Sequence, residues 1–92
     1  MPAKILTKHP QGKQGVRIDM DKYDTIKGAI ERELKAAGEL TFQDLTAKVD
    51  QRLKGKFDGS VGWYVTTVKL DLEARKKIER VGSKSPQVLR LR

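Results

Sequence analysis

Residues 60–92, SVGWYVTTVKLDLEARKKIERVGSKSPQVLRLR, decide the fold because they predict one helix followed by two strands. Ser60 is a good N-cap residue, since its hydroxyl can accept a hydrogen bond from a backbone N–H of the first turn. The buried stripe at helical spacing is Val61, Val65, Val68 and Leu72, flanked by Tyr64 and Arg75. The opposite face carries Trp63, Thr66, Thr67 and Leu70, with Lys69 on its flank. We expect this helix to end near residues 75–77.

Two short strands follow this helix. Residues 78–81 form the first, and residues 88–92 alternate apolar and basic side chains, as a half-buried strand does. The segment 82–87, rich in Gly, Ser and Pro, is expected to be the exposed turn between them.

Two further helices are predicted upstream. Tyr23, Ile26, Ile30, Leu34 and Ala37 form one apolar stripe, with Asp19 or Asp21 as the expected cap and Gly38 as the terminator. Gly28 weakens this helix unless another backbone packs against it. The next helix has Thr41 as N-cap and Asp44 in the capping-box position. Its apolar face is Phe42, Leu45, Val49 and Leu53, and it ends at residues 54–56.

Residues 1–18 have two interpretations, a β-hairpin or a basic arm packed on a main domain of residues 19–92. Two apolar pieces, Ile5-Leu6 and Val16 to Ile18, flank a loop rich in turn residues. We favour a strand pair that covers the first helix, because these four apolar side chains need burial. The alternative is an arm that follows a DNA backbone, since the segment has four basic residues and no acid.

The charge is unevenly distributed along the 92 residues. The chain has 20 basic and 12 acidic side chains, a net charge of +8. Residues 1–18 carry +4, residues 19–50 carry −3 and residues 51–92 carry +7. Basic flanks around an acidic middle favour a polyanionic partner over a uniformly solvated surface.

The order helix, helix, turn, helix, hairpin resembles the winged helix-turn-helix family, most strongly over residues 37–92. Leu40-Thr41-Phe42 lies where that family has a small strand and a second-helix cap, and residues 72–81 look like its passage from recognition helix into β-hairpin wing. Many members have a glycine and an apolar residue where Lys76 and Lys77 stand. The whole chain, including residues 12–15 and 59–64, also resembles a small group of uncharacterised bacterial winged-helix proteins, which implies an α+β fold and no established activity.

The leading functional hypothesis is binding of double-stranded DNA, as in a small transcriptional regulator or a nucleoid-associated protein. The third helix would lie in the major groove, and the basic wing would contact phosphates. The candidate contact residues are Lys54, Lys56, Ser60, Gly62, Trp63, Thr66, Thr67, Lys69, Arg75, Lys76, Arg80 and Lys84. This helix face lacks Arg, Asn and Gln, the side chains that most often make bidentate base contacts.

Trp63 and Leu70 support an alternative function, a protein–protein interaction module that uses their shared face. Burial of both under the N-terminal segment is a third interpretation. RNA binding shares the charge argument but lacks a surface set of stacking aromatics. We expect a monomer or a weak homodimer, because no long C-terminal helix is present to join two copies.

Other function classes find little support. Cysteine is absent, no residue cluster has zinc-ligand spacing, and no nucleophile–base series is visible. Asp19, Asp21 and Asp24 fit helix capping better than cation binding. No long apolar run follows Met1, so neither a secretory signal nor a membrane span is expected. We therefore expect a cytoplasmic protein without enzymatic activity, cofactor or metal.

Overall fold

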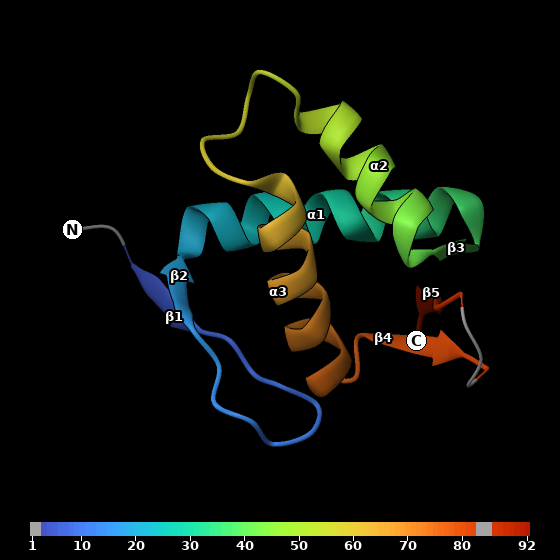
Figure 1. Cartoon of the computed structure of the whole chain (residues 1–92), viewed down its shortest axis with the longest axis horizontal. Coiled ribbons are helices and arrows are strands. Elements are labelled where there is room, and N and C mark those ends of the chain that lie inside the picture. Colours follow the sequence, from blue (N-terminus) through green and yellow to red (C-terminus); the bar gives the residue numbers. More distant parts are fainter. Residues whose placement is uncertain (1–2, 83–85) are drawn as a thin grey trace.

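Three helices and two small antiparallel sheets make up the structure, a computed structural model that describes residues 3–82 and 86–92 (Figure 1). The elements are β1 (Lys4–Leu6), β2 (Arg17–Asp19), α1 (Met20–Ala37), β3 (Glu39–Thr41), α2 (Phe42–Leu53), α3 (Val61–Ala74), β4 (Ile78–Val81) and β5 (Val88–Leu91). The predicted α+β class is confirmed. None of the helices described is both long and apolar enough to cross a membrane.

The N-terminal segment is a strand pair. Strands β1 and β2 are antiparallel with Ile5 opposite Ile18, which confirms the strand-pair interpretation for the described part of the N-terminal segment. Of the four predicted apolar side chains, Ile18 is buried and Ile5 is half-buried. The expectation that all four apolar side chains are buried is wrong, because Leu6 is 54% and Val16 41% exposed. A strand pair this short covers α1 with one of its faces only.

Helix α1 begins one residue after the hairpin. Asp19 occupies the N-cap position, but its side chain makes no capping hydrogen bond, so the expected side-chain cap at this position is wrong. The Met20 N–H instead donates to the carbonyl of Ala3, which joins the start of α1 to the N-terminal segment. Gly38 ends the helix at a positive φ of 84°, as predicted.

The core lies where α1 packs against α2 and α3, and it continues onto the three-stranded sheet. Its buried side chains are Ile18, Tyr23, Ile26, Ala29, Ile30, Leu34, Leu45, Val49, Val61, Val65, Val68, Leu72, Ile78 and Leu89. The predicted apolar stripes of the three helices supply most of this set. Ala37 is exposed, although it continues the stripe of α1.

Helices α2 and α3 are joined by the exposed loop 54–60. Both begin with the predicted caps: Thr41 Oγ1 accepts from the Asp44 N–H, and Ser60 Oγ accepts from the Trp63 N–H at 3.3 Å. In Figure 1, α3 crosses α1, and the β1–β2 hairpin and the three-stranded sheet lie on either side of α3.

The three-stranded sheet has the order β3-β5-β4, so the last strand lies between two earlier ones. Leu89 is paired with Leu40 of β3 and with Arg80 of β4. The Phe42 N–H also bonds to the carbonyl of Gln87 at 2.8 Å, which fixes the start of α2 to the sheet.

The end of α3 has a lysine where glycine is usual. Lys76 has a positive φ of 63°. Its N–H bonds to the carbonyl of Glu73, and the N–H of Lys77 bonds to the carbonyl of Leu72. These two bonds form a Schellman motif, whose left-handed residue is usually glycine. Lys76 therefore holds a backbone conformation that its Cβ disfavours.

Candidate nucleic-acid interface

The outward face of α3 is partly open to solvent. Gly62, Trp63 and Thr66 are exposed, and we call these three residues the α3 strip. Thr67 and Leu70, predicted on the same face, are half-buried. A Cβ built on Gly62 meets nothing within 4 Å, so the first turn of α3 is open to close approach. The Thr66 hydroxyl donates to the carbonyl of Gly62 at 3.0 Å and retains lone pairs for a further donor.

Trp63 is not covered by the N-terminal segment. Its 48% exposure excludes the interpretation in which the hairpin buries it. The indole ring lies edge-to-face with Tyr64, at 4.9 Å between ring centroids and 79° between planes. Tyr64 is in turn edge-to-face with Phe57 of loop 54–60, at 5.1 Å. Trp63 is therefore the exposed member of a cluster of three aromatic rings, in which Tyr64 packs between Trp63 and Phe57.

Lys69 does not belong to the exposed face, so its prediction as a contact residue is wrong. It is 4% exposed, and its Nζ lies 3.3 Å from Glu73 Oε1 and 5.2 Å from the Phe42 ring centroid. Burial lowers the pKa of Lys69, and the charge of Glu73 opposes that shift. The side chain turns from the flank of α3 toward α2 and the sheet, where its charge is balanced internally.

Two predicted arginine contacts are engaged within the protein. Arg75 Nε donates to both oxygens of Asp71, at 3.0 and 2.9 Å. Arg80 Nε lies 3.5 Å from Glu73 Oε1, although its side chain is 54% exposed. Arg75 is half-buried beside its partner, so we remove it from the candidate contacts, whereas Arg80 can still present its outer nitrogens to a phosphate.

The remaining predicted lysines flank α3. Lys54 and Lys56 are exposed in the loop before α3, and Lys76 is exposed directly after it. Within residues 3–82 and 86–92, no acidic side chain forms an ion pair with these three lysines. Ser60 is exposed, but its hydroxyl caps the helix. Lys84 lies outside the described residues.

A buried aspartate that sequence reasoning missed fixes the N-terminal loop to α3. Asp71 is fully buried and accepts hydrogen bonds from the Tyr23 hydroxyl, the Lys8 N–H and the Arg75 Nε. The loop therefore lies beside the last turn of α3, where Lys8 and Lys13 line one hollow together with Ala74. The spacing of Asp71 and Arg75, four residues apart in a helix, was the available signal for the pair.

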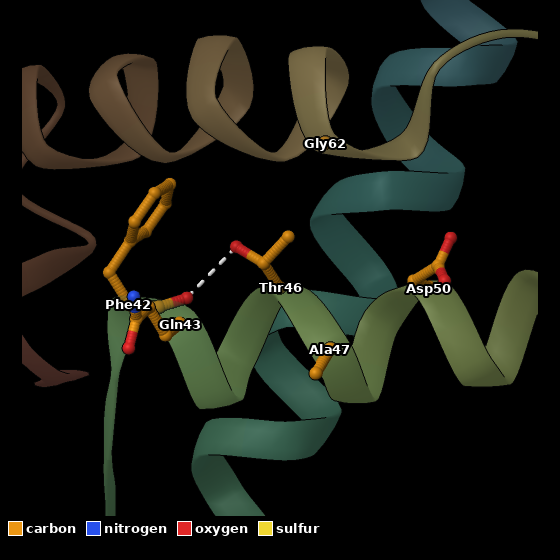
Figure 2. A pocket seen from close by; sticks show the side chains of 6 residues that line it. All are labelled: Phe42, Gln43, Thr46, Ala47, Asp50 and Gly62. Atoms are coloured by element: carbon orange, nitrogen blue, oxygen red, sulfur yellow. Dashed lines mark hydrogen bonds between the residues drawn. The ribbon is translucent and has the colours of Figure 1, made fainter.

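A shallow groove of about 430 Å³ separates α2 from the start of α3. Figure 2 shows Phe42 and Thr46 pointing from α2 toward α3, with Asp50 at the far end and Gly62 above. The Thr46 hydroxyl donates to the carbonyl of Phe42 at 2.9 Å. Because Asp50 places a carboxylate at the groove, we do not place a DNA phosphate there. In the described part of the chain, no group of three His or carboxylate side chains is arranged to hold a metal ion.

Comparison with known proteins gives one finding. The model of a family of unknown function, DUF6958, matches residues 4–89. The chain belongs to this family. The comparisons with curated proteins and with solved structures give no match. The region that DUF6958 covers contains all three helices and every candidate residue named above.

Proposed function

We propose that this DUF6958 chain is a winged helix-turn-helix domain that binds double-stranded DNA. Two features of the fold support the proposal. Helices α2 and α3 are consecutive and joined by a short loop, and α3 leads into the β4–β5 hairpin, which would be the wing. The order β3-β5-β4 places a strand from before α2 at the edge of the sheet that contains this hairpin.

The observation that carries the proposal is the position of the α3 strip between two groups of exposed lysines. Lys54 and Lys56 precede the helix, and Lys76 and Lys77 follow it. The 14 residues of α3 span about 21 Å at 1.5 Å per residue. The DNA major groove is about 12 Å wide, so a helix of this length that lies in the groove has basic residues at both of its ends near phosphates.

The chemistry of this surface favours backbone contacts over base-specific contacts. With Lys69 buried, the α3 strip offers one hydroxyl, one indole and an open glycine. Such a surface has no side chain for bidentate recognition of guanine or adenine. We therefore expect salt-sensitive binding with weak sequence preference, which suits a nucleoid-associated protein better than a regulator of one site.

The test is a titration of labelled random-sequence duplex with the protein, followed by fluorescence anisotropy at several salt concentrations. Four lysines on phosphates, Lys54, Lys56, Lys76 and Lys77, give a slope of log K against log salt of about −3.6. Affinity should therefore fall steeply between about 50 mM and about 200 mM salt. No binding at the lowest salt concentration would refute the proposal.

A second candidate function is docking of a protein partner on the same helix face. The 48% exposure of Trp63 favours it, because large exposed aromatics are frequent anchors of interfaces. Leu70 contributes less than predicted, since it is half-buried. If this function is correct, Trp63→Ser should dissociate a homodimer or complex, as measured by sedimentation velocity. A wild-type protein that sediments as a monomer and binds DNA without a protein partner would count against this second function.

A further inference from the structure

We propose that Trp63 is a stacking platform for an unpaired DNA base. The proposal rests on the DNA-binding function above and narrows its substrate to duplex DNA that contains an unpaired nucleotide, such as a bulge. The bases of an intact duplex are already stacked on one another, so they leave no free face on which the Trp63 indole can stack.

The geometry holds the indole ring before any ligand arrives. Tyr64 contacts Trp63 edge-to-face, and the Tyr64 ring is itself confined by Phe57 and by the close backbone of Gly59. A Cβ built on Gly59 would lie 3.1 Å from the Tyr64 ring, which shows how tightly the loop packs there. A ring that is held this way loses little conformational freedom when a base stacks on it.

Positive charge lies beside the platform. Lys22 Nζ is 5.5 Å from the Tyr64 ring centroid and 5.9 Å from that of Phe57. Lys54 and Lys56 belong to the same loop as Phe57. Aromatic rings next to basic side chains are the combination that binds unpaired nucleic acid: the rings stack on bases, and the cations attract the backbone.

The residues around Trp63 also disfavour recognition of paired bases. The α3 strip lacks the amide and guanidinium groups that contact base edges, and the lysine predicted to do so is buried. The exposed indole in the first turn of α3 can instead stack on a base that is extruded from the duplex.

The experiment uses the fact that Trp63 is the only tryptophan of the chain, so intrinsic fluorescence reports on this one side chain. The protein is titrated with an intact duplex and with the same duplex carrying a single extra unpaired thymine. We expect quenching of Trp63 by the bulged duplex and little quenching by the intact one. Stacking of one base corresponds to about 5- to 140-fold in affinity, so the bulged duplex should bind at least about five times more tightly.

Variants separate stacking from charge. Trp63→Ala should remove the preference for the bulged duplex, so that the variant binds the bulged and the intact duplex with equal affinity, whereas Trp63→Phe should keep part of the preference. An unchanged urea midpoint of each variant shows that the fold is retained. Equal affinity for both duplexes with unquenched fluorescence would overturn this inference and leave DNA binding standing. Failure to bind either duplex would overturn both.

Discussion

The backbone N–H of Lys8 donates a 2.8 Å hydrogen bond to the carboxylate of Asp71, across 63 positions of sequence. This bond ties the N-terminal loop to α3. The same buried carboxylate accepts hydrogen bonds from the Tyr23 hydroxyl and the Arg75 guanidinium, so it joins the loop, α1 and α3. A buried charge is tolerated only when it is paired and hydrogen-bonded, and these three partners supply both kinds of contact here.

Asp71→Asn should destabilise the protein by about 2 kcal/mol or more, because the neutral amide cannot replace a carboxylate that is paired with Arg75 and bonded to two other donors. Urea unfolding followed by circular dichroism measures the change. Tyr23→Phe removes a single bond and should cost about half as much. If the free energy of unfolding of Asp71→Asn lies within about 0.5 kcal/mol of the wild-type value, the substitution has the effect of an ordinary surface change. The carboxylate would then not hold the three elements together.

Alkaline pH should weaken the fold through Tyr23. Burial, and then the bond and charge of Asp71, raise the pKa of Tyr23 well above its usual value of 10.0. Above pH 10 the unfolded chain has lost this proton while the folded protein keeps it, so stability falls as pH rises. The loss should be about 1.4 kcal/mol per pH unit relative to Tyr23→Phe. Urea unfolding of both proteins at neutral and alkaline pH tests this, and parallel pH profiles would contradict it.

Gly28→Ala should stabilise the protein by about 0.5–1 kcal/mol, because a Cβ there meets nothing within 4 Å and alanine is the better helix former. The sequence left open whether another backbone packs against Gly28. The space around it is open, so no neighbouring backbone requires a glycine here. Gly15→Ala is the matched control and should destabilise, because its Cβ would lie 1.7 Å from the carbonyl oxygen of Thr7. Thermal unfolding of the two variants should shift in opposite directions.

Lys76→Gly should stabilise the protein by about 1 kcal/mol, because glycine adopts the left-handed conformation at the end of α3 without a steric cost. The two capping hydrogen bonds from residues 76 and 77 stay in place. Urea unfolding should show a higher midpoint for Lys76→Gly and a midpoint near the wild type for Lys76→Asn. A lower midpoint for the glycine variant would show that the lysine side chain itself stabilises the helix end.

The local signals in the sequence predicted the elements well. Thr41 and Ser60 as caps, Gly38 as a terminator and the alternation of residues 88–92 each act within a few residues. Their outcome depends little on the rest of the chain, which is why the boundaries agree with the structure within one or two positions.

The long-range features could not be predicted in the same way. Lys69 is buried because Phe42 of α2 and Arg80 of β4, through Glu73, surround its position on α3. Trp63 stays exposed because Asp71 holds the N-terminal loop at the other end of α3. Helical periodicity gives the direction of a side chain but does not say which element covers it.

The central claim is that DNA binds at the α3 strip and its flanking lysines. The most direct test compares two double variants with the same change in net charge. The first variant, Lys54→Glu with Lys56→Glu, reverses the charge of two side chains in the loop before α3. The second, Lys35→Glu with Lys48→Glu, reverses the charge of two exposed side chains on α1 and α2. Lys48 lies in a hollow beside Glu33 and not in the groove that faces α3. The account predicts that the first pair lowers duplex affinity at least about ten-fold by anisotropy at low salt, and that the second lowers it far less. Equal losses for the two pairs would show that only net charge attracts DNA, and would contradict a binding site on α3.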